Sequence, residues 1–239
     1  MIRVEGVRKT FGTKVALDSL SFAAQDGMVT GLLGANGAGK TTALRIVSGL
    51  LRPDSGAAVV DGVNAGEDRE GAQRRLGVIP DEAGLYGRLT TREQVRYFGN
   101  LRGLRGPELE RRIDRLLESL GLAALADRRV AGFSHGERKK VALARALVHE
   151  PGNVILDEPT NGLDVMSTRA LREIVRDLRR DGRCVLLSSH VMQEIAALCD
   201  RIVVVAGGRR VAEGTAEELV ARAGMLTLED AFVALAEER

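Results

Sequence analysis

The stretch GANGAGKTT, residues 34–42, restricts the fold more than any other part of this sequence. It matches the pattern G-x-x-x-x-G-K-[ST]; the apolar run MVTGLLG (28–34) precedes it, and TTALRIVSGLL (41–51) follows it. The apolar run predicts a buried strand. The segment after it has apolar residues at helical spacing, namely Ala43, Ile46, Val47 and Leu50. A glycine-rich loop between a buried strand and a helix turns its N–H groups inward to bind phosphate oxygens. The alternative, a glycine-rich turn without a ligand, is disfavoured by this context.

The rest of the chain predicts a mixed α/β fold. Apolar and polar residues alternate in residues 2–9 and 15–24, which predicts antiparallel strands with one buried face. Strands and helices alternate again from NVILDE (153–158) to RIVVVA (201–206), as in a parallel sheet covered by helices. We therefore predict an α/β protein with a P-loop NTPase (RecA-like) core and an antiparallel β subdomain.

Residues 91–150 differ from this pattern, because they hold three helical patterns and no clear strand. The first pattern places Val95, Phe98 and Leu101 on one face, and the third begins at Ser134. We interpret this segment as an inserted α-helical subdomain. The expected organisation is a single nucleotide-binding domain over 1–239, with a catalytic α/β core at 1–90 and 151–225, a helical lobe at 91–150 and a C-terminal helix at 226–239.

Composition and charge exclude several classes of protein. The chain has 239 residues and a formal net charge of +2, and its arginine pairs are spread along the sequence. We therefore expect no nucleic-acid partner, since such proteins concentrate basic residues in one patch. The N-terminal segment lacks the apolar run of a signal peptide, and no stretch approaches the length of a membrane span. Cys184 and Cys199 stand alone in apolar segments, so we expect reduced packing residues of a cytoplasmic protein.

Lys40 and Thr41 carry the chemistry expected of the glycine-rich loop. Lys40 would reach the β and γ phosphates of a nucleotide, and the Thr41 hydroxyl would ligate Mg²⁺. Such a site also needs an acid that holds Mg²⁺ through water, and VILDEPT (154–160) delivers Asp157 to the carboxyl edge of the sheet. A carboxylate at Glu158 would orient the attacking water toward the γ-phosphate. The alternative is an Asp-Glu pair that merely ends a strand.

These motifs, in this order, resemble the ATP-binding subunits of ABC transporters over nearly the whole chain. GANGAGKTT resembles Walker A, VILDE resembles Walker B, and residues 162–164 resemble the D-loop. His190 stands where the family has a switch histidine that contacts the γ-phosphate, and Phe11 stands where an aromatic residue stacks on adenine. The resemblance implies ATP and Mg²⁺ as cofactors and catalytic roles for Lys40, Glu158 and His190. The loop and D-loop residues that it implies in nucleotide binding are Gly34, Asn36, Gly37, Ala38, Gly39, Lys40, Thr41, Thr42 and Asp164.

FSHGERKK (133–140) takes the place of the family signature, which is usually written LSGGQ. Ser134 and Glu137 by themselves predict a capping box at the start of a helix. In the family, this helix start points at ATP held by the Walker A loop of a second subunit. The two interpretations are compatible, because both use the free N–H groups of a helix start. Ser134 and Gly136 match the family pattern, whereas His135 and Glu137 depart from it. Glu137 can still accept a ribose hydrogen bond, and we expect altered affinity.

Asp81 stands where the family usually has the glutamine of the Q-loop. Aspartate is a good ligand for Mg²⁺, and its short reach favours a bridging water. We therefore predict Asp81 as a metal residue beside Thr41 and Asp157. The alternative is a solvated acidic turn formed by Asp81 and Glu82. The helical lobe that follows this loop is the family's contact surface for the membrane subunit.

The resemblance implies a transport function. Two copies, or one copy with a related ATPase subunit, would sandwich ATP and drive an integral-membrane permease from the inner face of the cell membrane. Asp81, residues 190–209 and LEDAF (228–232) resemble the sodium-extruding branch of ABC-2 exporters (NatA type), which implies Na⁺ export. The alternatives are another ABC-2 exporter, for a drug, lipid or polysaccharide, and an ATPase with a soluble partner. The length of the chain excludes the two cassettes of ribosome-acting relatives. The segment 42–134 lacks the long coiled coils of DNA-repair ATPases.

Overall fold

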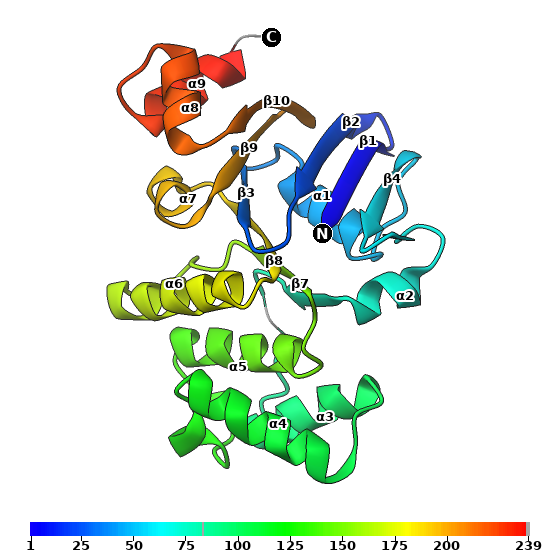
Figure 1. Cartoon of the computed structure of the whole chain (residues 1–239), viewed down its shortest axis with the longest axis vertical. Helices are drawn as coiled ribbons and strands as arrows, with labels where there is room; N and C mark the ends of the chain where they lie inside the picture. Colours follow the sequence, from blue (N-terminus) through cyan, green and yellow to red (C-terminus); the bar gives the residue numbers. More distant parts are fainter. Residues whose placement is uncertain (83, 238–239) are drawn as a thin grey trace.

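The computed structural model describes residues 1–82 and 84–237, which form two sheets, covering helices and a separate helical lobe (Figure 1). The strands are β1 (Ile2–Phe11), β2 (Lys14–Ala24), β3 (Val29–Leu33), β4 (Ser55–Val60), β5 (Val63–Asn64), β6 (Leu76–Ile79), β7 (Asn153–Asp157), β8 (Cys184–Ser189), β9 (Arg201–Ala206) and β10 (Arg209–Gly214). The helices are α1 (Lys40–Val47), α2 (Arg69–Arg74), α3 (Thr91–Leu101), α4 (Gly106–Ser119), α5 (His135–Leu147), α6 (Val165–Arg180), α7 (Met192–Leu198), α8 (Ala216–Ala223) and α9 (Leu228–Glu237). None of these helices has the length and apolar character needed to cross a membrane. The last two residues of the predicted C-terminal segment lie outside the described residues.

The larger sheet has six strands in the order β10-β9-β3-β8-β7-β6. β3 lies at its centre and pairs in parallel with β8 and β9, and β6, β7 and β8 are parallel as well. The prediction of a parallel core is therefore confirmed for these strands, and β10, which follows them in the chain, pairs antiparallel with β9. Gly207 and Gly208 both have left-handed backbones, with φ of 55° and 77°, and they close a tight hairpin there.

The central strands are buried on both faces, as their continuous apolar sequences predict. Every residue of β3, β7 and β8 is buried. Along β7, Val154 and Leu156 belong to the core shared with the helical lobe, whereas Ile155 belongs to the core shared with the smaller sheet. Because β7 runs parallel to β6 and β8, Asp157 at its end comes at the carboxyl edge of the sheet.

The smaller sheet is antiparallel, in the order β2-β1-β4-β5, and shares its core with α1. α1 ends at Val47, and Gly49 follows with a left-handed φ of 66°. The prediction that Leu50 continues the buried face of this helix is therefore wrong, and its side chain is 59% exposed. The sequence also gave no indication of α2, because a helix of six residues is too short to show a period.

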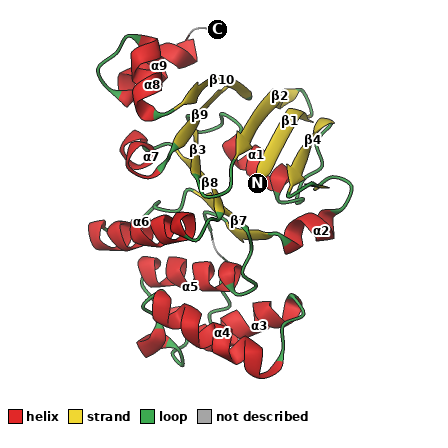
Figure 2. Cartoon of the chain, in the orientation of Figure 1, coloured by secondary structure: helices red, strands yellow, loops and turns green. Residues whose placement is uncertain are grey.

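The helical lobe consists of α3, α4 and α5 and contains no strand among its described residues, as Figure 2 shows. α4 buries one stripe of its surface, with Leu109, Ile113 and Leu117 inside. The prediction for α3 is partly wrong, because Val95 is buried but Leu101 is 63% exposed. A Cβ atom at Gly99 would lie 2.5 Å from Cδ1 of Leu109. The close approach of the two helices at Gly99 therefore decides which face of α3 is buried.

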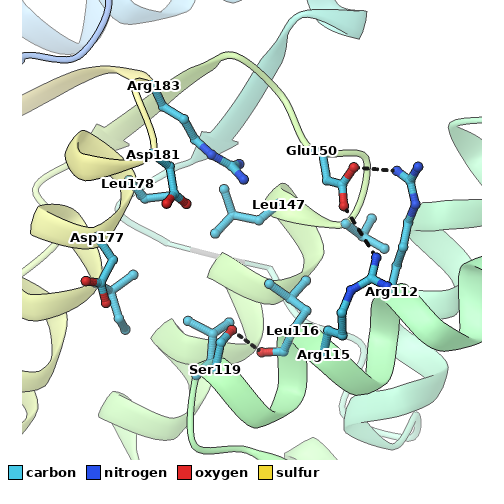
Figure 3. A pocket seen from close by; sticks show the side chains of 13 residues that line it. Arg112, Arg115, Leu116, Ser119, Leu147, Glu150, Asp177, Leu178, Asp181 and Arg183 are labelled. Atoms are coloured by element: carbon cyan, nitrogen blue, oxygen red, sulfur yellow. Dashed lines mark hydrogen bonds and ion pairs between the residues drawn. The ribbon is translucent and has the colours of Figure 1, made fainter.

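A cleft of about 260 Å³ lies where the lobe meets α6 and the base of the sheet (Figure 3). Glu150 connects α5 to β7 in a left-handed conformation with φ of 53°. Its carboxylate lies 3.2 Å from Nη1 of Arg112 and 3.8 Å from Nη2 of Arg115, both on α4. Arg183 on the core side donates a hydrogen bond to the Pro151 carbonyl at 3.3 Å. The cleft is thus bordered by polar contacts within the lobe on one side and within the core on the other.

Candidate active site

The loop between β3 and α1 forms one wall of a pocket of about 400 Å³. Gly37 and Gly39 have φ of 83° and 110°, a region in which side chains are strained. A Cβ atom at Gly39 would also lie 2.7 Å from the Ala16 carbonyl oxygen. The loop conformation therefore requires glycine at position 39, and it leaves the start of α1 facing the pocket.

Most of the predicted nucleotide-binding residues of this loop line the pocket, namely Asn36, Gly37, Gly39, Lys40, Thr41 and Thr42. Gly34 and Ala38 do not line it. A Cβ atom at Gly34 would lie 2.5 Å from the Val205 carbonyl oxygen, and Ala38 is buried, so these two residues shape the loop from beneath. Phe11 lies at the pocket and is 51% exposed, with Nζ of Lys9 5.8 Å from the centre of its ring.

Lys40 is buried at the start of α1 and is held by oxygen atoms on two sides. Its Nζ donates a hydrogen bond to the Gly34 carbonyl at 2.7 Å and lies 3.3 Å from Oε1 of Glu158. The side chain is only 6% exposed, so both contacts act where solvent screens charge poorly. The structure thus brings together the predicted phosphate-binding cation and the predicted catalytic carboxylate.

Glu158 also contacts the third predicted catalytic residue. Its Oε2 lies 2.9 Å from Nδ1 of His190, so one carboxylate bridges an ammonium group and an imidazole. Glu158 has a left-handed backbone with φ of 45°, a conformation that is strained for glutamate. Such strain concentrates at functional sites, where surrounding contacts hold it in place. Here the Glu158 N–H donates to the carbonyl oxygen and to the hydroxyl oxygen of Ser188, each at 3.1 Å.

Asp157 lies beside the loop with two hydroxyl groups around its carboxylate. Ser188 Oγ donates a hydrogen bond to Oδ1 of Asp157 at 2.6 Å, and Thr41 Oγ1 lies 3.4 Å from the same atom. A hydroxyl and a carboxylate are oxygen ligands that suit Mg²⁺, which usually takes its remaining ligands from water and phosphates. No three His, Cys, Asp or Glu side chains in residues 1–82 and 84–237 form a metal site by themselves. The Thr41 hydroxyl and the Asp157 carboxylate fit a metal whose other ligands come from a nucleotide and water.

Sequence reasoning missed Ser188, the next-to-last residue of β8, which pairs with Asp157 of β7. The strand CVLLSS changes from apolar residues to serines at the carboxyl edge of the sheet, and this change was the available signal. Asp81 lines the same pocket, and its carboxylate has two nearby partners, Nδ2 of Asn161 at 3.3 Å and Nζ of Lys139 at 3.6 Å. Its place at the pocket agrees with the metal prediction, which stays a prediction.

The predicted residues of the signature and D-loop do not line this pocket. Ser134 and Glu137 form the predicted capping box at the start of α5: the Glu137 N–H donates to Ser134 Oγ at 3.2 Å, and the Ser134 N–H donates to Glu137 at 2.7 Å. Gly136 packs against Ser167, whose Oγ would lie 2.4 Å from a Cβ atom there. Asp164 caps α6 by accepting from the Ser167 N–H at 2.8 Å, and this contact lowers the pKa of Asp164. Within the chain, the signature and D-loop residues therefore form a group separate from the residues that line the pocket around Lys40.

The site thus combines a glycine-rich loop, the acidic residues that end β7, and the separate capped start of α5. Comparison with known proteins decides to which family a chain with this site belongs. The profile of the ABC transporter family matches residues 17–161. The chain belongs to the ABC transporter family of ATP-binding proteins. Members of this family bind ATP and are ATPases coupled to transport.

Two curated relatives are ATP-binding proteins of Bacillus subtilis (strain 168). The chain is 42% identical over 205 residues to "ABC transporter ATP-binding protein NatA", which covers 85% of the chain and 83% of the relative. It is 37% identical over 224 residues to "Linearmycin resistance ATP-binding protein LnrL", and this match covers 94% of the chain and 72% of the relative. Among solved structures, an ATP-binding subunit of an ABC transporter matches 99% of the chain and 100% of its own length, with a TM-score of 0.90 and 30% identity. The P-loop NTPase fold and the NatA-like branch predicted from the sequence are thereby confirmed.

Proposed function

We propose that two copies of the chain close around ATP, hydrolyse it, and so drive export through a separate permease in the membrane. The observation that supports this most strongly is the separation of Ser134 and Asp164 from the pocket that holds Lys40. Both residues are exposed, and Val165 and Met166 beside Asp164 are 70% and 71% exposed. Exposed apolar side chains next to polar motif residues are typical of a surface that another protein covers.

The start of α5 would complete the nucleotide site of the partner. The first N–H groups of a helix have no carbonyl partner within it, and the helix dipole favours an anion there. In the closed dimer, Ser134 and Gly136 would bind the γ-phosphate of ATP held by the loop of the other copy. Glu137 would accept a hydrogen bond from the ribose, and Asp164 would line the contact between the copies. Phe11 would stack on the adenine.

Within each protomer, the charged residues of the pocket would change partners when ATP binds. Lys40 now contacts Oε1 of Glu158, and the γ-phosphate would attract Lys40 in its place. Oε1 would then be free to accept a proton from the attacking water, while His190 holds Oε2. Mg²⁺, held by Thr41 and Asp157 with Asp81 acting through water, would neutralise negative charge on the phosphates.

Replacement of the proposed base tests the catalytic part of the proposal. Glu158→Gln keeps the shape of the side chain and removes its capacity to take a proton. We expect steady-state ATP hydrolysis to fall by about 10²- to 10⁴-fold, the usual contribution of a general base, while ATP binding persists. Phosphate release and nucleotide binding measure the two properties separately. Glu173→Gln, on the exposed surface of α6, is the matched control with unchanged activity. Wild-type turnover in Glu158→Gln would remove this carboxylate from the mechanism.

The helical lobe carries the surface that we propose for the permease. Tyr86, Tyr97 and Leu101 are 51%, 44% and 63% exposed, and the rings of Tyr86 and Tyr97 lie 5.7 Å apart, edge to face. Arg145 lies over the ring of Phe98 at 4.5 Å from its centre, and this ring also packs against both tyrosines. Exposed aromatic side chains of this kind anchor protein interfaces. The group follows Asp81 in the chain, so a partner bound here would sit close to the nucleotide pocket.

We propose Na⁺ as the exported ion, on the strength of the 42% identity to NatA. The 37% identity to LnrL supports the alternative of a different ABC-2 export substrate, since an ATPase subunit does not itself select the solute. The test is reconstitution of the chain with its permease in vesicles, with Glu158→Gln as the inactive control. ATP-dependent movement of radioactive Na⁺ is the expected result. Hydrolysis without Na⁺ flux would contradict the sodium assignment and leave the ATPase proposal standing.

A further inference from the structure

Lys139 is a buried cation that neither the sequence motifs nor the proposed catalytic steps use. It lies on α5 and is only 4% exposed. Burial lowers the pKa of Lys139, and the neighbouring Asp81 acts in the opposite direction. A buried ammonium group persists in a folded protein only where oxygen atoms surround it. The partners of Lys139 therefore indicate what it does.

The Lys139 ammonium joins three parts of the molecule. Its Nζ donates a hydrogen bond to the Asp81 carbonyl at 2.8 Å and lies 3.4 Å from the Glu158 carbonyl oxygen. One side chain of the helical lobe thus holds the backbone after β6 and the backbone after β7. The latter belongs to the residue proposed as the catalytic base.

The Asp81 carboxylate is held less tightly than the Asp81 carbonyl. Its Oδ1 lies 3.6 Å from Nζ of Lys139 and 3.3 Å from Nδ2 of Asn161, both beyond the usual range of a strong hydrogen bond. Asp81 lines the nucleotide pocket, a pocket of about 470 Å³ that His135 and Arg138 line, and a pocket of about 350 Å³ that Thr41 and Asp157 line. Asp81 therefore stands where these pockets meet, and we expect rotation of its side chain to move the carboxylate from one pocket toward another.

We propose that Lys139 is a positioning residue that competes with Mg²⁺ for the Asp81 carboxylate. The inference rests on the proposed function, in which Thr41 and Asp157 hold Mg²⁺ beside ATP. Without nucleotide, Lys139 and Asn161 keep the carboxylate. With nucleotide and Mg²⁺, the carboxylate turns to the metal through a water molecule, while Lys139 keeps both backbone carbonyls. Because this exchange occurs only in the metal-bound state, it links the helical lobe to occupancy of the metal site.

Mg²⁺ titration of nucleotide binding to the full chain tests the inference. Binding of a fluorescent ATP analogue is measured in EDTA and then at increasing Mg²⁺ concentration. Lys139→Gln keeps a hydrogen-bond donor for the carbonyls and removes the charge. Since the carboxylate is then free for the metal, we expect half-maximal binding at about tenfold lower Mg²⁺, the usual size of an effect exerted through a metal ligand. Binding in EDTA should not change, and Lys139→Arg, which keeps the charge, should behave as wild type.

An Asp81→Asn background separates release of the carboxylate from simple charge repulsion. Lys139→Gln should produce no shift there, because no carboxylate remains to be released. An unshifted Mg²⁺ dependence in the single variant, or an equal shift in the Asp81→Asn background, would overturn the inference. Lys139→Met, an apolar side chain of similar length, replaces Lys139→Gln if that variant does not fold. Failure of the wild-type chain to bind nucleotide under either condition would instead contradict the proposed function itself.

Discussion

The charged side chains of the nucleotide pocket already have partners before any nucleotide is bound. Lys40 contacts Glu158 at 3.3 Å, Glu158 contacts His190 at 2.9 Å, and Asp157 accepts a hydrogen bond from Ser188 at 2.6 Å. ATP therefore has to exchange one set of contacts for another rather than fill an array of unpaired charges. Such an exchange weakens binding of the nucleotide alone and makes its affinity depend on the contacts added when the site closes.

His149 gives the molecule a dependence on pH outside the nucleotide pocket. Burial, together with the nearby Arg102 and Arg183, lowers the pKa of His149 from its ordinary value of 6.5 to about 4, although the hydrogen bond between Nε2 and the Leu76 carbonyl at 3.1 Å acts in the opposite direction. Between these two pH values the unfolded chain binds a proton that the folded chain does not. The free energy of unfolding is therefore highest above pH 6.5 and falls as the pH drops toward 4.

We expect the free energy of unfolding to fall by about 2 kcal/mol because of His149 as the pH drops from 6.5 to 4. This figure allows for the solvent that still reaches the ring. Urea unfolding of the wild type and of His149→Gln at neutral and at acidic pH measures the effect. The variant, which has no group that titrates there, should lose less stability on acidification. Equal losses in the two proteins would show that another group is responsible.

At the scale of the elements, the contact between α5 and β6 joins the helical lobe to the core. Gly77 of β6 lies so close to α5 that a Cβ atom would be 2.6 Å from the Ala146 carbonyl oxygen and 2.9 Å from Cγ of Pro151. Gly77→Ala must push the helix and strand apart, and we expect it to lower the free energy of unfolding by about 2 kcal/mol.

Gly132→Ala is the matched control for this substitution, because no heavy atom lies within 4 Å of a Cβ atom placed there. We expect its stability to stay within about 0.5 kcal/mol of the wild type, as for ordinary surface changes. Chemical denaturation of both variants measures the difference. If Gly77→Ala were as stable as Gly132→Ala, the contact between β6 and α5 would accept a methyl group without loss of stability, contrary to this prediction.

The elements that the sequence predicted well are those whose pattern is local. The buried strand before Lys40 and the capped helix start at Ser134 each depend on a few neighbouring residues. The contacts that were missed join distant segments: Lys139 reaches Asp81 across 58 residues, and Ser188 reaches Asp157 across 31. A single sequence carries no local sign of such pairs, because they depend on which strands become neighbours in the sheet.

The exposed face of α3 was mispredicted for a related reason, because it follows from where α4 packs against Gly99. Leu50 is exposed for a local reason, because α1 ends at Val47, before Gly49. Packing between elements thus overrides periodicity where the amphipathic pattern is short.

For the molecule as a whole, we propose that one protomer holds only half of each ATP site. The helix start at Ser134 does not line the pocket around Lys40, so in the proposed dimer each would meet its complement on the other copy. In a two-fold dimer, each site combines the loop of one copy with the helix start of the other. Two different defects, placed in two different copies, should therefore compensate each other.

Mixing of two variants measures this directly. Lys40→Ala removes the phosphate-binding cation, and Ser134→Phe blocks the helix start, with Ser134→Thr as a control that keeps the capping hydroxyl. Each of the first two should be inactive alone, and Ser134→Phe should still bind ATP. In an equal mixture, half of the dimers contain both variants and hold one intact site, so about a quarter of all sites become active. Recovery of ATP hydrolysis to about that level is the result we predict. No gain on mixing, or full activity of Ser134→Phe by itself as a monomer, would contradict the claim.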